Sequence, residues 1–198
     1  MSGELGDHVG ELVSANLGLI PDFPEPGVLF RDITPLIANG TAFRELMQVP
    51  GERYAGKIDA VAGLESRGFI LGAPLATELG IGMLTIRKAG KLPGHVIGDD
   101  YALEYGSARM EIRPESVTPG ARVLIVDDVA DSGKTLKMVM DLVKEHGLSL
   151  DGETQVKVDA RCAVIYKKPV SIIEPDYVWR HTDKWINFPW STLPTISA

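Results

Sequence analysis

Two adjacent carboxylates, Asp127 and Asp128, follow an apolar segment and precede a loop of small and polar residues. The segment 122–126 is rich in β-branched residues, as expected for a strand buried on both faces of a parallel sheet. A helix is expected after the loop, so the loop offers backbone N–H groups and hydroxyls at a positive helix start, which suits a phosphate dianion. The loop consists of Ala130, Asp131, Ser132, Gly133, Lys134 and Thr135.

The two acids restrict the kind of phosphate site. Carboxylates beside a phosphate repel it unless they face hydroxyls or a divalent cation, and ribose hydroxyls with Mg²⁺ meet both needs. A nucleotide-binding P-loop requires glycine five residues before Gly133, where this chain has Asp128. The alternative without a ligand is an ordinary strand-to-helix turn with Asp131 or Ser132 as the helix cap. That alternative explains the capping residues but not the two acids.

A second anion site is expected after another apolar strand. Glu65, Ser66 and Arg67 follow that strand and precede a helix, so backbone N–H groups and the Arg67 guanidinium can bind an anion there. Arg87 and Lys88 end the next strand and add positive charge from the opposite side, although a solvated basic strand end is the alternative for this pair. Lys91 follows three residues later.

The hydrophobic pattern predicts an α/β fold, because strands and helices alternate along the chain and such alternation produces a mostly parallel central sheet flanked by helices. The predicted strands are 58–64, 82–86, 121–126 and 158–166, and the predicted helices are 5–17, 41–47, 69–79 and 135–146. The Pro-rich segment 20–35 is expected to be ordered by packing rather than by regular structure of its own, and 147–154 is expected to be a polar connection.

The long segment 89–105 contains three glycines and a proline and has little helical pattern in its first half. Loops of this length in compact domains are usually functional or disordered. A lid that closes over a reacting sugar and keeps water out is one interpretation. A β-hairpin that merely projects is the other.

Composition limits the function classes. A chain of 198 residues is long enough for one α/β domain, and its net charge of −7 argues against a nucleic-acid binder. The single cysteine, Cys162, excludes an internal disulfide and is expected to be a buried apolar residue, while the four histidines lack metal-ligand spacing. The first residues do not resemble a signal peptide and no segment has the length of a membrane span, so no membrane association and a cytoplasmic location are expected.

Five segments together carry a resemblance to a known family. VLIVDDVADSGKTL resembles the phosphoribosyl-diphosphate (PRPP) signature of the type I phosphoribosyltransferases. FPEPGVLFRDITPL, GLESRGFILG, RKAGKLPG and YALEYG are similar in order and spacing to segments of the adenine phosphoribosyltransferases, over residues 17–140. The end of the chain, CAVIYKKPVSIIEPDYVWRHTDKWINFPW, instead resembles the base-binding end of the xanthine-guanine and related 6-oxopurine phosphoribosyltransferases.

The resemblance implies a single domain over 1–198 with the type I phosphoribosyltransferase fold, in which 17–36 and 167–198 form a small base-binding hood. It implies a salvage enzyme that transfers the phosphoribosyl group of PRPP to a purine, releases pyrophosphate and acts as a homodimer with Mg²⁺. The phosphate loop 130–135 would hold the 5′-phosphate. Asp127 and Asp128 would hold the ribose and, through PRPP hydroxyls and water, the metal. The pyrophosphate would lie against Glu65, Ser66, Arg67, Arg87, Lys88 and Lys91.

The base is the open part of the interpretation. For adenine, the resemblance points to Leu29, Phe30 and Arg31, and to Glu104 as a carboxylate that exchanges a proton with the purine. For a 6-oxopurine, it points to Lys168 at the exocyclic group, Trp185 on the ring face and the Ile186 backbone at the far edge. Lys168 is donor-only, which suits a 6-oxo group, although Lys167 and Lys168 could point to solvent and Trp185 could be a core residue. Adenine is favoured because its matching segment is longer.

A PRPP-sensing regulator is the third hypothesis, but no basic helix-turn-helix segment precedes residue 17.

Overall fold

The computed structural model describes residues 6–23, 26–27, 29–102, 107–116, 118, 120–145, 158–181 and 183. The chain divides into two compact units, one made of Met1–Val49 with Asp183–Ala198 and the other of Pro50–Thr182. The predicted single domain and the hood limits stay predictions.

The first unit contains a short hairpin and helices. Its elements are α1 (Gly6–Ala15), β1 (Gly18–Pro21), β2 (Leu29–Asp32), α2 (Thr34–Ala38) and most of α3 (Gly40–Tyr54). β1 and β2 pair antiparallel, so the expectation that 20–35 lacks regular structure is wrong. The two strands supply hydrogen bonds to each other across the Pro-rich turn, whereas the sequence shows only the prolines. Phe30 is 2% exposed and its ring lies edge-on to that of Phe23 at 5.1 Å.

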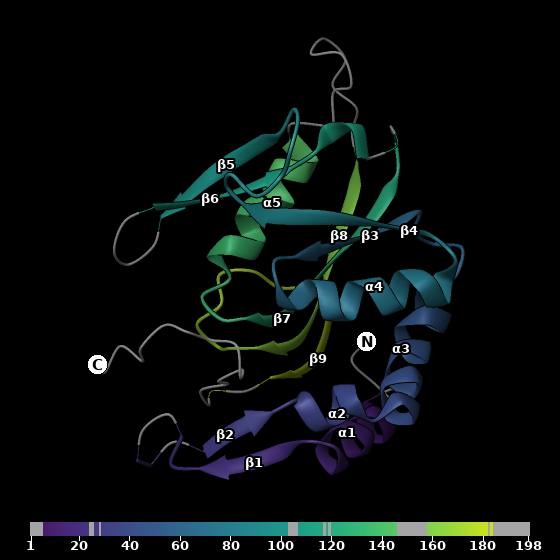
Figure 1. The fold of residues 1–198 in the computed structure, drawn as a ribbon, viewed down its shortest axis with the longest axis vertical. Coiled ribbons are helices and arrows are strands. Elements are labelled where there is room, and N and C mark those ends of the chain that lie inside the picture. The colour runs from purple at the N-terminus through teal and green to yellow at the C-terminus, as the bar shows by residue number, and fades with distance from the viewer. Residues whose placement is uncertain are drawn as a thin grey trace. The chain divides into compact units, whose positions relative to one another are not determined.

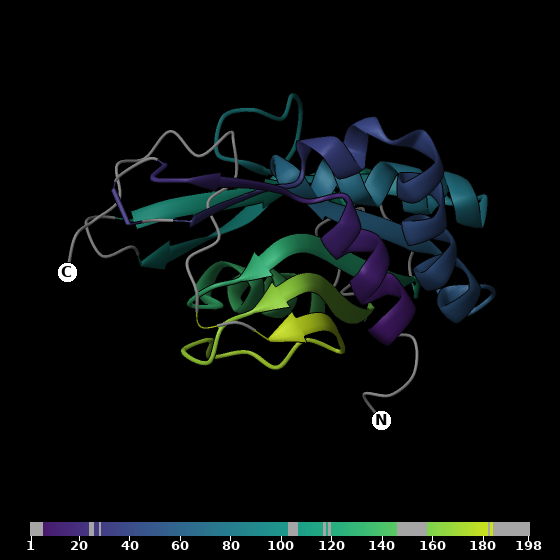
Figure 2. The same ribbon diagram turned by 90° about the horizontal axis from the view of Figure 1, so that it is seen from below.

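The second unit is built on a seven-stranded sheet (Figures 1 and 2) with the order β5-β6-β4-β3-β7-β8-β9. Its strands are β3 (Ala60–Leu64), β4 (Gly82–Lys88), β5 (Ile97–Ala102), β6 (Ser107–Ile112), β7 (Arg122–Ala130), β8 (Asp159–Lys167) and β9 (Tyr177–His181). β4, β3, β7, β8 and β9 are parallel to one another, and β6 pairs antiparallel with both β4 and β5. A short 3₁₀ turn, Pro114–Ser116, precedes β7.

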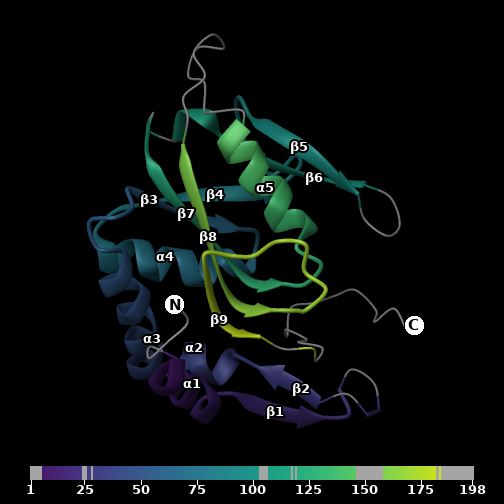
Figure 3. The same cartoon turned by 180° about the vertical axis from the view of Figure 1, so that it is seen from behind.

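Two helices cover opposite faces of this sheet. α4 (Arg67–Leu79) lies in front of the strands in Figure 1, and α5 (Lys134–Glu145) lies in front in the reverse view of Figure 3. Right-handed crossovers explain this arrangement, because β3 leads through α4 to β4 on one side, whereas β7 leads through α5 to β8 on the other. The crevice outside the carboxyl ends of β3 and β7 is therefore a topological switch point, where open α/β sheets bind ligands.

The core of the second unit lies between the sheet and its helices. Val61, Ala62, Leu124 and Ile125 of the central strands have no measurable exposure. Cys162 on β8 is 1% exposed, as predicted, and burial raises the pKa of its thiol to about 11. Among the described residues, no helix is long and apolar enough to cross a membrane.

The predicted elements of the second unit are present, but β6 and β9 were not predicted, and two predicted segments differ from the structure. β7 extends to Ala130, so Asp127 and Asp128 lie within a strand and not after it. The reason is that β8 continues beside it, pairing Asp127 with Val164 and Ala130 with Lys167. The segment 89–105 contains β5, which forms an antiparallel pair with β6, so the hairpin interpretation describes its second half. The predicted connection 147–154 lies outside the described residues.

Candidate active site

The acid pair stands near the carboxyl end of β7. Successive residues of a strand point to opposite faces, so the two carboxylates have different surroundings. Asp128 is 2% exposed, and Arg67 Nη1 donates to its Oδ2 at 2.9 Å, whereas Asp127 is half-buried. The Asp128 N–H donates to Asp127 Oδ1 at 2.9 Å, and the Val129 N–H donates to Asp128 Oδ1 at 2.8 Å. The pair is thus fixed by backbone donors and by one guanidinium from the start of α4.

Both acids hold their protons more tightly than an exposed aspartate. Burial, together with the neighbouring Asp128 carboxylate, raises the pKa of Asp127 well above its usual value. Burial also raises the pKa of Asp128, although the Arg67 guanidinium opposes that rise. Added positive charge or hydroxyl donors would stabilise the ionised forms. The pair is therefore suited to a ligand that brings hydroxyls or a cation.

The phosphate loop 130–135 follows β7 directly and leads into α5, whose first-turn N–H groups have no carbonyl partner within the helix. Gly133 adopts a φ of +75°, and a Cβ at this position would lie 2.4 Å from Ser171 Oγ. Both facts require glycine there. The Ile172 N–H donates to the Ser132 carbonyl at 3.0 Å, and the Lys168 N–H donates to the Ala130 carbonyl at 3.0 Å. The segment after β8 thus braces the loop in one conformation.

Lys168 also contacts the phosphate loop through its side chain. Its Nζ lies 2.9 Å from Asp131 Oδ1, and its side chain is only 10% exposed. Lys167 pairs with Glu174 and its side chain is 13% exposed. The alternative that both lysines point to solvent is therefore wrong, because neither side chain is more than 13% exposed and each ammonium pairs with a carboxylate. The role of Lys168 toward a base stays a prediction.

The second anion loop joins the ends of β3 and β4. The Glu65 carboxylate accepts hydrogen bonds from Arg87 Nη2 at 3.0 Å and Lys91 Nζ at 2.7 Å on Oε1, and from the Lys88 N–H at 3.0 Å on Oε2. Burial alone would raise the pKa of Glu65, but these donors outweigh it and lower the pKa to about 2. The alternative of a solvated basic strand end does not describe Arg87, because its guanidinium pairs with Glu65.

The turn from β3 into α4 is unusually close to β7. A Cβ on Gly68 would lie 2.3 Å from the Val126 carbonyl oxygen, and one on Gly63 would lie 2.7 Å from the Gly68 carbonyl oxygen. The Glu65–Ser66 peptide bond is cis. Glycine at both positions lets the first turn of α4 approach β7, and this approach brings Arg67 to Asp128.

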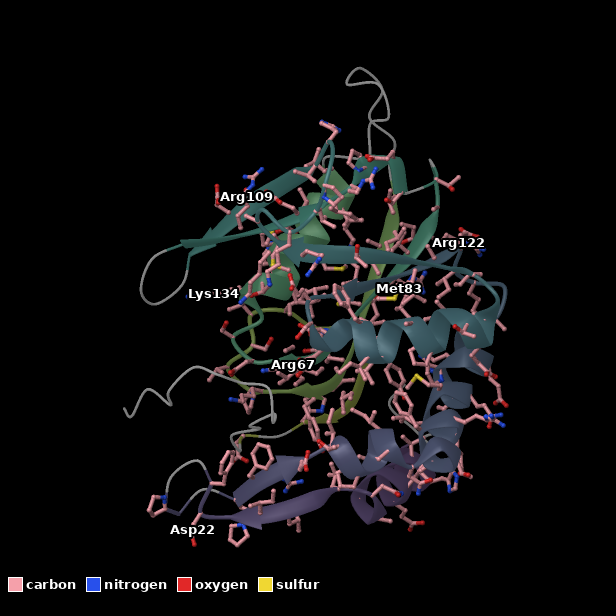
Figure 4. All side chains as sticks on the ribbon, viewed as in Figure 1. Asp22, Arg67, Met83, Arg109, Arg122 and Lys134 are labelled. Atoms are coloured by element: carbon pink, nitrogen blue, oxygen red, sulfur yellow. The ribbon has the colours of Figure 1, made fainter. Side chains whose placement is uncertain are left out.

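The two loops lie at one end of the strands. Figure 4 shows Arg67 and Lys134 on the same side of the second unit, whereas Arg122 lies at the other. The structure thus brings together, within the second unit, the residues predicted to bind the phosphate, the ribose and the pyrophosphate. Leu29, Phe30 and Arg31 belong to β2 of the first unit, with Leu29 48% exposed. Glu104, Trp185 and Ile186 lie outside the described residues.

The residue types fit Mg²⁺ held largely by a substrate. No group of three or more His, Cys, Asp or Glu side chains among the described residues is arranged to hold a metal. Asp127 and Asp128 offer two hard oxygen donors, one of which already accepts from Arg67. Mg²⁺ in such sites keeps several waters and is bound through one or two carboxylates plus substrate oxygens. The donor set therefore fits a metal that arrives with a polyhydroxylated diphosphate.

Comparison with known proteins identifies the class that this fold and these two loops define. The phosphoribosyl transferase domain family matches residues 36–194. The chain therefore belongs to the phosphoribosyl transferase family, and the predicted family and α/β fold are confirmed.

Within that class, the chain is similar to adenine phosphoribosyltransferases. The protein of Chloroflexus aurantiacus is 52% identical over 129 residues, which cover 65% of this chain and 75% of that protein. The protein of Thermobifida fusca is 47% identical over 149 residues, covering 75% and 85%. The crystal structure of the Saccharomyces cerevisiae enzyme, complexed with D-2,5-dideoxy-2,5-imino-altritol 1,6-bisphosphate and adenine, has a TM-score of 0.68 at 32% identity and covers 81% of this chain and 89% of that one. The 6-oxopurine resemblance of the tail stays a prediction.

Proposed function

We propose that this chain transfers the 5-phosphoribosyl group of PRPP to adenine, giving AMP and pyrophosphate. The observation that carries the proposal is the juxtaposition in one unit of an acid pair on β7, a braced phosphate loop and a cluster of cations at the ends of β3 and β4. The similarity to adenine phosphoribosyltransferases supports adenine as the base.

Positioning and charge perform most of the proposed reaction. The N–H groups of 131–135 bind the 5′-phosphate, and Asp127 and Asp128 accept from the ribose hydroxyls. Arg67, Arg87, Lys88 and Lys91, with the Ser66 turn, neutralise the pyrophosphate as its bond to C1′ breaks, and the purine nitrogen attacks C1′. Bound Mg²⁺ would supply further positive charge at the pyrophosphate and ribose oxygens.

Glu104 is proposed to exchange a proton with the purine, in the segment that connects β5 to β6. Glu104→Gln is expected to lower turnover far more than PRPP affinity, because the substitution removes a proton-transfer group but no phosphate contact. Initial-rate assays measure turnover, and a PRPP titration measures PRPP affinity. An equal loss of both would contradict this role. We also propose a homodimer, which sedimentation equilibrium would test.

The decisive experiment supplies PRPP and Mg²⁺ with adenine, hypoxanthine, guanine or xanthine and follows nucleotide and pyrophosphate. Turnover with adenine supports the proposal, and no turnover with any base would overturn it. Asp127→Asn is expected to reduce turnover, and Asp59→Asn is the matched control, because Asp59 pairs with Arg122 at the other end of the sheet.

A 6-oxopurine is the second candidate base, because the buried Lys168 ammonium lies at the phosphate loop and can only donate. Lys168→Met would loosen Asp131 whatever the base, so the informative quantity is the ratio of kcat/KM between hypoxanthine and adenine. If Lys168 donates a hydrogen bond to a 6-oxo group, the ratio of kcat/KM for hypoxanthine to that for adenine falls. If Lys168 only braces the loop, both values fall together.

A further inference from the structure

Glu65 poses an electrostatic problem in the proposed pyrophosphate site. A carboxylate there repels the diphosphate of PRPP, so a direct contact between the two would weaken binding. The depressed pKa of about 2 means that Glu65 stays ionised at neutral pH. Its presence therefore needs an explanation other than ligand contact.

The contacts of Glu65 supply that explanation. Oε1 accepts from Arg87 Nη2 and Lys91 Nζ, and Oε2 accepts from the Lys88 N–H. Arg87 Nη1 also donates to the Lys91 carbonyl at 3.1 Å. Glu65, Arg87 and Lys91 thus form a closed cluster, the Glu65 clamp, which ties the end of β3 to the end of β4 and to the first residues of the segment 89–105.

Exposure shows which side of the clamp meets a ligand. The Glu65 side chain is 9% exposed, whereas those of Arg87 and Lys91 are 33% and 48% exposed. The carboxylate therefore lies behind the two cations, and the cations face outward. Two cations and one carboxylate leave a net charge of +1 on the clamp, which still favours an anion. Arg87 Nε is buried and has no hydrogen-bond partner among the described residues, so the outward-facing part of this guanidinium is its terminal nitrogens.

We propose that Glu65 is a positioning residue that presents Arg87 and Lys91 to the pyrophosphate of PRPP and fixes the base of the segment 89–105. This inference rests on the proposed function. Long cationic side chains lose rotamer entropy when they bind an anion, and a clamp that holds them beforehand reduces that loss. The negative charge of Glu65 is offset because the cations lie between it and the ligand.

Two substitutions separate positioning from simple charge repulsion. Glu65→Gln removes the charge, and Glu65→Asp keeps the charge but shortens the side chain. Positioning predicts that both substitutions weaken PRPP binding, Glu65→Gln by about tenfold, because the neutral amide keeps one acceptor oxygen and loses both the second acceptor and the charge that hold the cations. Repulsion predicts that Glu65→Gln binds PRPP more tightly and that Glu65→Asp is unchanged. The KM for adenine is expected to stay constant in both variants.

Isothermal titration calorimetry of the full chain with PRPP and Mg²⁺, without purine, measures the PRPP affinity of the parent and of each variant. Asp59→Asn is the matched control, since Asp59 is also an arginine-paired carboxylate with its pKa lowered to about 2, at the opposite end of the sheet. If the parent binds PRPP and the Glu65 variants bind it equally well or better, the inference is overturned while the proposed function stands. If the parent binds no PRPP, both are overturned.

A double-mutant cycle tests whether Glu65 acts through the cations. In an Arg87→Met, Lys91→Met background, Glu65→Gln is expected to change PRPP affinity by less than twofold, because the groups that it positions are absent. A full tenfold effect in that background would show that Glu65 acts by another route and would overturn the inference.

Discussion

Gly68→Ala tests how the β3–α4 turn builds the site. The new Cβ would lie 2.3 Å from the Val126 carbonyl oxygen and 3.2 Å from the carbonyl carbon of Gly63, both backbone atoms of strands in the sheet. An ordinary C···O contact needs about 3.3 Å, so the first turn of α4 has to move by about 1 Å. Overpacking of this kind costs about 1–3 kcal/mol of the free energy of unfolding.

The same movement affects catalysis, because Arg67 begins α4 and contacts Asp128. A displacement of about 1 Å in a positioning residue can lower activity about 100-fold. We therefore expect kcat/KM for PRPP to fall about 100-fold in Gly68→Ala. Urea unfolding followed by circular dichroism measures the first effect, and steady-state assays at varied PRPP measure the second.

Gly72→Ala is the matched control on the same helix. Its Cβ would meet Met83 Cε and Val61 Cγ1 at 3.4 Å, which is ordinary contact, and alanine in a helix interior is favoured over glycine by about 1 kcal/mol. We expect this variant to be as stable as the parent or more so, with unchanged activity. The reasoning would be refuted if Gly68→Ala were as stable and as active as the parent.

Three further predictions concern single side chains. Arg67→Met removes the cation that Asp128 contacts, so the pKa of Asp128 rises further, and a carboxyl with a raised pKa favours the folded state at low pH. The loss of unfolding free energy relative to the parent should therefore grow from a small value near pH 4 to about 3 kcal/mol near pH 8. Urea titrations at several pH values measure this loss, and a loss that stays constant with pH would contradict the prediction. Gly133→Ala combines a φ of +75° with a Cβ 2.4 Å from Ser171 Oγ, so calorimetry should show weaker PRPP binding and a lower Tm, and an unchanged Kd would contradict the role of this loop. The Cys162 thiol, with a pKa of about 11 and 1% exposure, should react with a thiol reagent at least about 100-fold more slowly near pH 8 in the folded protein than in urea, and equal rates would show that β8 is accessible.

The central strands could be predicted because buried strands leave an apolar signal. This signal is continuous in Val123–Val126, and in β8 it becomes continuous from Cys162 onward, after the exposed Asp159 and Arg161. The edge strands β5 and β9 could not be predicted. β5 has the sequence IGDDYA and becomes a strand only because β6 pairs with it, and β9 depends on β8 in the same way. Strand propensity depends on neighbours, which a local pattern does not contain.

The geometry of the candidate site could be predicted only in part, and the roles of its residues stay predictions. The residue types of the phosphate loop and the acid pair indicate their chemistry directly. The Lys168–Asp131 contact joins residues that are 37 positions apart. The Glu65 clamp joins residues that are up to 26 positions apart. Both cross strand ends, and the register between strands is a property of the tertiary structure. No spacing rule in the sequence indicates that Glu65 meets Lys91 and not another cation.

The strand order has a consequence for how the protein acquires its site during synthesis. β3 and β7 are neighbours at the centre of the sheet, yet Ala60 pairs with Val123, so their contact closes a chain segment of more than sixty residues. Non-local parallel pairs form slowly, because the entropy of closing the loop is lost before the contacts form. The Glu65–Arg67 loop leaves the ribosome well before its partner strand does, and Arg67 has no Asp128 to meet until then. The Arg67–Asp128 contact and the central β3–β7 pair therefore form in the same late folding event. A folding intermediate that lacks this pair has not yet joined the acid pair to the Glu65–Arg67 loop, and we expect it not to bind PRPP.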